Sequence, residues 1–388
     1  MSLFTLEALK AKHGDSLLLT ANGATVLIDG GPPGVYNQVL KQKLEELNGE
    51  ETNPAEIDLM MVSHIDSDHI AGILDLTSDL VDAQEQGTRP LVEILEVWHN
   101  SFSDAIANAK HDAKTVQQSA IATASLIDED PVITEKIHDA KMVLSSVTQG
   151  RNLARDIRTL SLDLNWGFKD QLVLRENAQE NWVAGDLTLN VIGPSQIELD
   201  KLKKDWAEKL PKILKKERSK KARIQAAQSL DNSVYNLASI VVIAQTGDKT
   251  MLLTGDARGD KILEWLKAEG YPEGKAHFDV LKLPHHGSDR NVSPEFFEKV
   301  TADNYVVCGD GKHGNPEPKT FQMLFDARAD DENFKIYMTF SPEELAEHKD
   351  YQKHDNDQLL NEILDAKPGR RDKIKFPGVK ETSISISV

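Results

Sequence analysis

The residues with the clearest chemical potential lie in one hexapeptide that follows an apolar run. The run Ile57 to Val62 predicts a buried strand. After Ser63, the hexapeptide 64–69 holds two imidazoles and two carboxylates: His64, Asp66, Asp68 and His69. Burying so many polar groups at a strand end is unfavourable unless a cation compensates them. The hexapeptide therefore predicts a metal site, and the alternative is an exposed polar turn with Asp68 as a helix cap.

Other apolar runs also end in polar residues beside glycine. Asp29, Asp256 and the pair His285-His286 each follow such a run. Glycine lets the backbone turn sharply and approach a bound ion or substrate. Because sites in layered α/β proteins gather where strand ends and their loops converge, we expect these ends to form one common site. Imidazole and carboxylate ligands suit Zn, Mn, Fe or Co, so these residue types do not identify which metal binds.

The expected strands and helices alternate along the chain. Expected strands cover 4–8, 16–20, 25–28, 57–62, 92–97, 187–192, 238–244, 250–253, 277–283 and 305–308, and expected helices cover 35–47 and 261–269. Between the two halves, 101–181 is polar and helical in pattern and can form a cap over the site. We therefore divide the chain into a first half of the fold (1–100), a mainly helical insertion with a returning strand near 187–192 (101–230), and a second half with a C-terminal extension (231–388).

The ordered motifs resemble the metallo-β-lactamase superfamily. Within it they are most similar to the soluble domain of the competence DNA-uptake channel protein and its standalone relatives. The similar segments are Gly14 to Ser16, Asp29 to Gly31, His64 to His69, Asn236 to Val241, Leu253 to Asp256 and Leu283 to Ser288. The resemblance implies an αββα sandwich, here with a helical insertion, and a metal centre at one edge of its two sheets.

The resemblance also implies roles for individual residues. It assigns His64 and Asp66 to a first metal position, Asp68, His69 and His285 to a second, and Asp256 to a bridging position. Asp29 would orient the ligands. Asp68 would also orient the nucleophile, and His286 would contact substrate, relay a proton or assist the leaving group. Which of His285 and His286 binds metal stays open.

The chain departs from the superfamily pattern at two places, and from a turn of the competence-type branch, a later Gly-His-Pro turn, at a third. Asp66 stands where many members have a histidine, and the turn after 187–192 is Gly193-Pro194-Ser195 where many have a further histidine ligand. The centre is therefore expected to hold one or two ions. His99 either replaces that ligand or is a partly buried histidine packed near Trp98. Asn315 replaces the histidine of that Gly-His-Pro turn, and with His313 it either contacts substrate or belongs to a structural loop.

Composition limits the location and the partners. The net charge of -18 and pI near 5.1 argue against a surface that attracts nucleic acid as a whole. The segment Lys201 to Gln225 reverses this balance, with eleven Lys or Arg and three acidic residues, and is either a solvated helical face or a contact for a polyanion. Cys308 is the single cysteine, no apolar stretch is long enough to cross a bilayer, and no signal segment is evident, so we expect a cytoplasmic protein without membrane contact.

The function expected from these features is hydrolysis that depends on a divalent metal, Zn or Mn. A bound divalent ion activates water near neutral pH and stabilises charge that develops on the substrate. A phosphodiester substrate is favoured, which predicts a nuclease or phosphodiesterase. The same centre also suits a small-molecule amide, ester, lactone or thioester. A third alternative is a non-catalytic binding module with a structural metal. The sequence does not indicate an oligomeric state.

Overall fold

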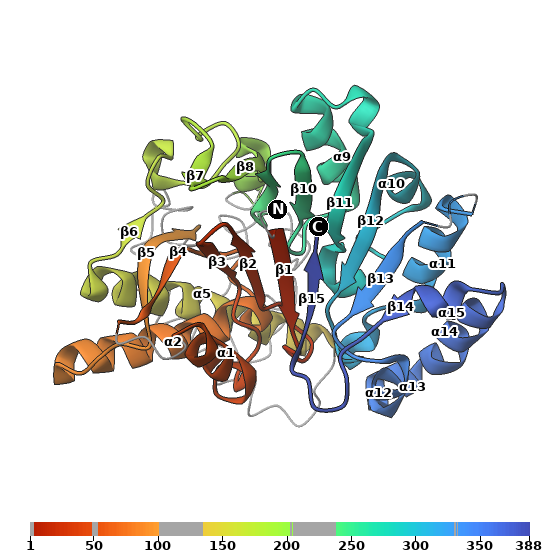
Figure 1. Cartoon of the computed structure of the whole chain (residues 1–388), viewed down its shortest axis with the longest axis horizontal. Helices are drawn as coiled ribbons and strands as arrows, with labels where there is room; N and C mark the ends of the chain where they lie inside the picture. The colour runs from red at the N-terminus through yellow and green to blue at the C-terminus, as the bar shows by residue number, and fades with distance from the viewer. Residues whose placement is uncertain are drawn as a thin grey trace, which may run out of the picture.

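The computed structural model describes residues 4–48, 53–100, 135–201, 204, 238–329, 331 and 333–388, with the backbone alone over 135–147. Two mixed sheets dominate these residues (Figure 1). The first has the order β15-β1-β2-β3-β4-β5-β6. Its strands are β1 (Phe4–Leu9), β2 (Leu17–Ala21), β3 (Ala24–Ile28), β4 (Ala55–Val62), β5 (Val92–His99), β6 (Asp163–Leu164) and β15 (Ser383–Ser387).

The second sheet has the order β14-β13-β12-β11-β10-β9-β8-β7. Its strands are β7 (Trp182–Ala184), β8 (Leu187–Gly193), β9 (Val241–Thr246), β10 (Lys249–Leu253), β11 (Ala276–Lys282), β12 (Val300–Val307), β13 (Lys335–Met338) and β14 (Ile374–Lys375). In both sheets a run of antiparallel strands changes to parallel pairing, at β3–β4 in the first and at β10–β11 in the second. The parallel strands end in the turns that carry the predicted site residues.

Helices cover the outer face of each sheet. The first sheet packs against α1 (Lys41–Asn48), α2 (Ser67–Gln86), α5 (Glu135–Leu160) and the π-helical turn η1 (Tyr36–Leu40). The second packs against α9 (Gly259–Ala268), α10 (Pro294–Lys299), α11 (Pro318–Ala327), α12 (Pro342–Glu347), α13 (Lys349–Lys353) and α14 (Asn356–Asp365), followed by α15 (Arg370–Lys373). Short 3-10 turns are η2 (Lys169–Gln171), η3 (Pro272–Gly274), η4 (Pro284–Gly287) and η5 (Lys312–Gly314).

The buried apolar side chains form three layers. One layer lies between the sheets, where Leu59 and Met61 of β4 belong to the same cluster as Met251 of β10 and Val280 of β11. The other two layers lie between each sheet and its helices. Alternate strand residues face opposite sides of a sheet, so one strand contributes to two layers. The predicted αββα sandwich is confirmed.

The stretch 101–181, which is polar and helical in pattern, and the residues just after it contribute to the sandwich itself. Helix α5 packs against α2, β6 pairs with β5 in the first sheet, and β7 pairs with β8 in the second. The division at residues 100 and 230 stays a prediction, because 101–134 and 205–237 lie outside the described residues. In the part of the chain that is described, no helix combines the length and apolar character needed to span a bilayer.

Candidate metal centre

The turn between β4 and α2 carries the predicted hexapeptide. Asp66 is the N-cap of α2 in an extended conformation, and its side chain makes no capping hydrogen bond. Asp68 and His69 then lie in the first turn of the helix. Asp68 is therefore not the helix cap, which removes the structural alternative considered for it.

Two turns of the second sheet supply the remaining predicted residues. Asp256 follows β10 through Gly255, whose φ of 48° is in the left-handed region and whose missing side chain leaves room for Ser63. His285 and His286 lie in η4 directly after β11 and also have positive φ values, 47° and 52°. Such values are uncommon for residues other than glycine and are found at functional sites. The turns thus aim consecutive histidines in different directions.

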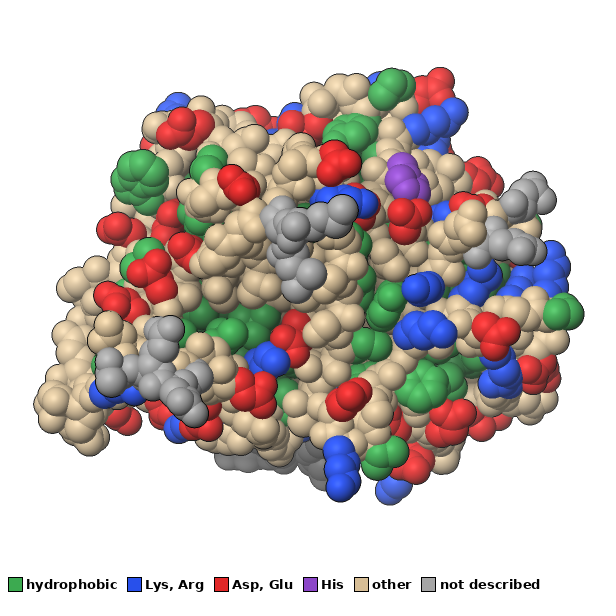
Figure 2. All heavy atoms as spheres, in the orientation of Figure 1, with side chains coloured by type: hydrophobic (Ala, Val, Ile, Leu, Met, Phe, Trp, Pro, Cys, Tyr) green, Lys and Arg blue, Asp and Glu red, His purple; other side chains and the backbone are tan. Residues whose placement is uncertain are grey.

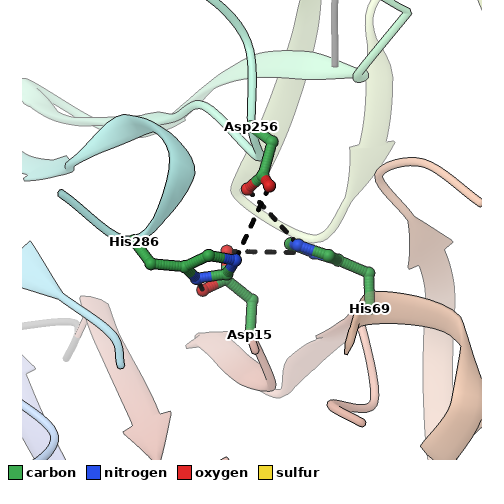
Figure 3. Close-up of side chains that lie close together, drawn as sticks. All are labelled: Asp15, His69, Asp256 and His286. Atoms are coloured by element: carbon green, nitrogen blue, oxygen red, sulfur yellow. Dashed lines mark hydrogen bonds and ion pairs between the residues drawn. The ribbon is translucent and has the colours of Figure 1, made fainter. Parts of the chain in front are cut away.

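Four buried side chains meet most closely: Asp15, His69, Asp256 and His286 (Figure 3). Each offers one ligand atom, and these atoms lie within 4.8 Å of one another. We call these residues the buried quartet. His69 Nε2 is 3.3 Å from Asp256 Oδ1, and His286 Nε2 is 3.6 Å from Asp256 Oδ2. The quartet is able to bind a metal ion.

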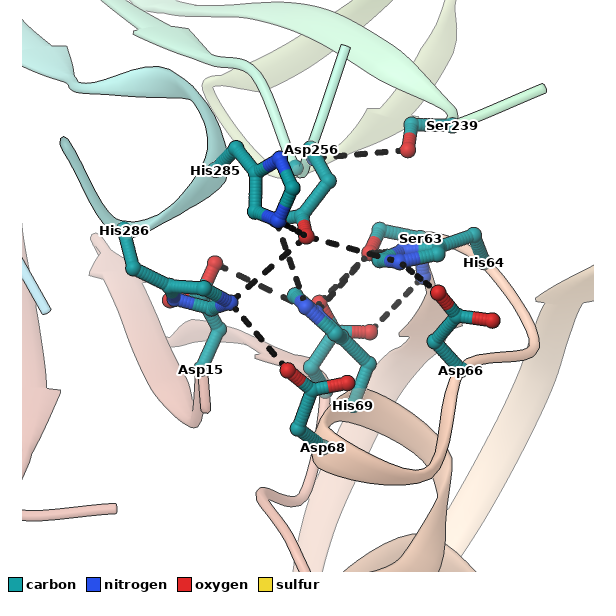
Figure 4. A network of polar contacts seen from close by, with 12 residues as sticks. Asp15, Ser63, His64, Asp66, Asp68, His69, Ser239, Asp256, His285 and His286 are labelled. Carbon is teal, nitrogen blue, oxygen red and sulfur yellow. Dashed lines mark hydrogen bonds and ion pairs between the residues drawn. The ribbon is translucent and has the colours of Figure 1, made fainter. Parts of the chain in front are cut away.

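The other predicted ligands surround the buried quartet (Figure 4). His64 Nε2 lies 3.7 Å from both Asp66 Oδ2 and Asp256 Oδ2. Asp68 Oδ2 lies 3.4 Å from His286 Nε2, and His285 Nε2 lies 3.5 Å from Asp256 Oδ2. The structure therefore brings all seven of these predicted residues together: His64, Asp66, Asp68, His69, Asp256, His285 and His286.

Unpartnered polar atoms show that this site fits a cation. The Nε2 atoms of His64, His69 and His286 and the Oδ1 atom of Asp256 are buried and lack a hydrogen-bond partner. Buried polar atoms are rarely left without a partner, because desolvation is then uncompensated. A divalent ion that accepts nitrogen and oxygen ligands would bind these four atoms together and so compensate their burial.

Two groups of the site, His64 and Asp256, already have the protonation states that suit metal binding. Burial lowers the pKa of His64 to about 3, so its imidazole is neutral at pH 7, the form that binds a metal. Burial opposes ionisation of Asp256, but His285, His286 and His69 hold the pKa of its carboxyl well below the usual range. Asp256 therefore stays a carboxylate, the form in which it binds a cation. Against the effect of burial, nearby carboxylates instead raise the pKa of His69 and His286, so these two imidazoles would release a proton when they bind an ion.

Asp29 makes the hydrogen bond expected of an orienting carboxylate. Its Oδ2 accepts from Nδ1 of His69 at 2.8 Å, which leaves Nε2 facing Asp256. Ser63 fixes Asp29 in turn, because its backbone N–H donates to Oδ1 and its hydroxyl donates to Oδ2. Such contacts set the tautomer and the ring orientation of a metal-binding histidine.

His99 is not joined to the other ligands. It ends β5 with 1% of its surface exposed, and both ring nitrogens lack a hydrogen-bond partner. Burial is the one cause that lowers its pKa, to about 4. Among the described residues, no hydrogen bond or ion pair connects its ring to the buried quartet. Its role as a ligand stays a prediction.

The loop with His313 and Asn315 lies against the loop that precedes Asp15. His313 and His13 stack edge to face with ring centroids 5.9 Å apart, and Lys312 Nζ is 3.1 Å from His13 Nε2. Asn315 closes the turn through its backbone, which exchanges hydrogen bonds with Lys312 and Gly311. Contact of His313 and Asn315 with substrate stays a prediction.

The sequence predicted no role for two charged residues of the centre. Asp15 belongs to the buried quartet, and Lys282 forms a buried ion pair with it. Asp15 was part of a motif similar to the family, but that motif suggested no role. A lysine near the end of the apolar run 277–283 was a usable signal for Lys282, because a buried lysine needs a compensating charge.

Comparisons with known proteins agree with the motifs over part of the chain. Residues 9–113 match the family model of the metallo-beta-lactamase superfamily, which confirms the resemblance over that segment. Over 103 residues the chain is 27% identical to ComE operon protein 3 of Bacillus subtilis (strain 168), covering 26% of this chain and 13% of that protein. The aligned segment is thus a small part of that relative.

Solved structures of low identity were also found. The metallo-beta-lactamase fold protein YhfI from Bacillus subtilis has a TM-score of 0.35 and 9% identity, covering 99% of this chain and 100% of that one. A Cronobacter sakazakii metallo-beta-lactamase with a HARLDQ motif has a TM-score of 0.30 and 14% identity, covering 94% and 92%.

Proposed function

From the metallo-β-lactamase resemblance of residues 9–113, we propose that the chain is a hydrolase that depends on Zn or Mn and acts on phosphodiesters. One observation carries this proposal. His69 Nε2, His286 Nε2 and Asp256 Oδ1 are buried without hydrogen-bond partners within the buried quartet, and the unpartnered Nε2 of His64 lies 3.7 Å from Asp256 Oδ2. When bound there, a divalent ion supplies an activated water and offsets negative charge on the substrate.

The exposed side of the site is where substrate would enter. The side chains of Asp66, Asp68 and His285 are 14%, 13% and 29% exposed, whereas those of His69 and His286 are almost fully buried. His286 is therefore better placed to hold the ion, and His285 to meet the substrate or its leaving group. This assignment reverses the roles that the family resemblance implied for the pair. A site open on one side favours catalysis over a closed structural metal site.

A cation beside the site favours an anionic substrate. Burial lowers the pKa of His13 to about 3, so its neutral Nε2 accepts a hydrogen bond from the Lys312 ammonium. In the described part of the chain, that ammonium forms no ion pair with a carboxylate. His13 is two residues from Asp15, whose backbone N–H donates to the carbonyl of Asp68 at 3.3 Å, so the loop that carries His13 contacts the centre. A fixed positive charge there would stabilise the charge of a phosphodiester during its hydrolysis.

Hydrolysis of an amide, ester, lactone or thioester is the second candidate. The net charge of -18 favours it, because a strongly acidic protein repels polyanionic substrates at long range. The two candidates separate in parallel assays with bis(p-nitrophenyl) phosphate and p-nitrophenyl acetate. Faster metal-dependent hydrolysis of the acetate, with none of the diester, would favour the acyl substrate.

The ligand set is tested with Asp256→Asn and His69→Ala. We expect both variants to lose metal-dependent hydrolysis of bis(p-nitrophenyl) phosphate while circular dichroism shows an intact fold, because each change leaves the apolar layers untouched. His277→Ala is the control, since His277 is an exposed histidine on β11. Full turnover by the two ligand variants, with the fold intact, would show that this centre is not the active one.

A further inference from the structure

Asp15 belongs to the buried quartet by distance, but both of its carboxylate oxygens already have partners. Oδ1 lies 3.1 Å from Nδ1 of His286, and Oδ2 forms an ion pair with Nζ of Lys282. Asp256 differs, because its Oδ1 is buried without a hydrogen-bond partner. Of these two aspartates, Asp256 is therefore the one that presents a carboxylate oxygen without a hydrogen-bond partner to a metal.

We propose that Asp15 is a positioning residue for His286 and not a metal ligand, and that the buried Lys282 ammonium holds it in this role. The proposal rests on the metal centre of the proposed function. Asp15 would accept the Nδ1–H of His286 and so leave the Nε2 lone pair directed at the ion.

The other half of the site contains the same arrangement. Asp29 holds Nδ1 of His69, and Nε2 of His69 faces Asp256. Asp15 holds Nδ1 of His286, and Nε2 of His286 also faces Asp256. The two histidines thus approach one carboxylate from opposite sheets, each fixed by an aspartate of the first sheet's loops. Ser63 secures Asp29, and Lys282 takes the corresponding place beside Asp15.

Lys282 is placed to join the two halves of the fold. It is the last residue of β11 and has 0% of its surface exposed. Its Nζ lies 3.4 Å from the carbonyl of Gly255, and its own carbonyl accepts from the Thr254 hydroxyl at 2.8 Å. The turn that carries Asp256 and the loop that carries Asp15 are therefore both attached to Lys282.

Charge balance gives a second reason for this lysine. The centre contains several carboxylates, and a further unpaired one would be expensive to bury. Lys282 cancels the charge of Asp15, so Asp15 can orient His286 without adding net negative charge beside the ion. A lysine suits this place because its compact ammonium reaches a buried oxygen as a point charge.

Metal affinity and ligand number test the proposal without substrate. Zn affinity is measured by competition with a chromophoric chelator, and coordination number by X-ray absorption of the Zn-loaded protein. For Asp15→Asn we expect unchanged coordination and an affinity about 10- to 100-fold weaker, the usual effect of losing an outer partner of a ligand. Asp256→Asn is the matched ligand variant and should lose an oxygen ligand.

Lys282→Met tests the lysine. We expect weaker Zn binding, and in the double variant Asp15→Asn/Lys282→Met no further weakening beyond that of Asp15→Asn, because the two residues act as one unit. The double variant also removes both buried charges, so it stays informative if Lys282→Met alone fails to fold.

Three outcomes would overturn the proposal. They are loss of an oxygen ligand in Asp15→Asn, wild-type affinity in that variant, and additive losses in the double variant. A wild-type protein that binds no Zn would end both this proposal and the proposed function. If the wild type binds Zn but does not hydrolyse phosphodiesters, only the substrate assignment fails.

Discussion

At the level of residues, the unpartnered atoms of the centre limit how much metal the protein can hold. We expect the purified protein to keep fewer than two equivalents of metal after dialysis against a mild chelator, as measured by elemental analysis. The four buried unpartnered atoms around the centre suffice for one ion. The turn where many relatives have a further histidine holds Pro194 and Ser195, and the Ser195 hydroxyl donates to Glu198.

Retention of two equivalents would contradict this expectation and point to an additional ligand. His99→Ala then decides whether His99 is that ligand. Loss of one equivalent in this variant would place its imidazole at the centre. An unchanged content would leave it as a buried histidine of β5.

His69 and His286 show which parts of the site a sequence can reveal. The hexapeptide with His69 was predictable because its ligands are neighbours in the chain and follow an apolar strand. Asp15 was not, because 271 positions separate it from His286, and no local spacing relates the two. Lys282 was missed although its place in an apolar run was a signal, because its partner Asp15 lies in a loop of the other sheet. The ligands that follow strand ends were therefore predictable, and the residues that orient them only in part.

At the level of elements, α2 is fixed by a close approach between two glycines. A side chain on Gly72 would place its Cβ 1.9 Å from the carbonyl oxygen of Gly30, and one on Gly30 would meet the backbone of Ile73 at 2.3 Å. The backbone N–H of Gly72 also donates to the carbonyl of Gly31. This contact sets the position of the first turn of α2, where Asp68 and His69 lie.

Gly72→Ala should therefore destabilise the protein. We expect a loss of about 1–3 kcal/mol in the free energy of unfolding, the usual cost of overpacking, and weaker Zn binding because the first turn of α2 must shift. Urea denaturation and chelator competition measure the two effects. Gly150→Ala in α5 is the control, since its Cβ would meet Ile65 at an ordinary 3.5 Å. There the higher helix propensity of alanine should raise stability by about 0.5–1 kcal/mol. Equal stability changes in the two variants would refute the argument from close packing.

Strands with strong apolar runs were predicted closely, and weakly patterned ones were missed. The expected strands 25–28 and 57–62 correspond to β3 and β4, which are buried between layers. The two-residue β6 and the three-residue β7 belong to polar stretches of the sequence and are too short to show a period. β15 alternates serine and isoleucine but gains its place only by pairing with β1. Pairing across the whole chain is a tertiary effect that local patterns do not contain.

At the level of the whole molecule, charge limits how a polyanion can bind. Figure 2 shows acidic and basic side chains interspersed over the described part of one face. The basic segment Lys201 to Gln225 lies almost entirely outside the described residues, so its role as a nucleic-acid contact stays a prediction. With a net charge of -18, long-range attraction cannot replace a local contact.

Replacing six lysines of that segment with glutamine tests this contact. The positions are Lys203, Lys204, Lys215, Lys216, Lys220 and Lys221. We expect weaker binding of single-stranded DNA and a flatter dependence of the binding constant on salt, because fewer counterions are released. Fluorescence anisotropy over a salt series measures both. Hydrolysis of bis(p-nitrophenyl) phosphate should stay unchanged, and wild-type DNA affinity and salt slope in the variant would leave the segment as a solvated face.

The pairing of β1 with β15 affects how the protein can fold during synthesis. Thr5 lies opposite Ser387, and the two ends of the described chain meet side by side (Figure 1). While a ribosome extends the chain, β1 has a neighbour on one side only, and its other edge stays available to foreign strands. A contact spanning this much sequence also slows the search for the native topology. The edge of β1 in the nascent first sheet therefore stays open until β15 has emerged, and during that time aggregation competes with folding.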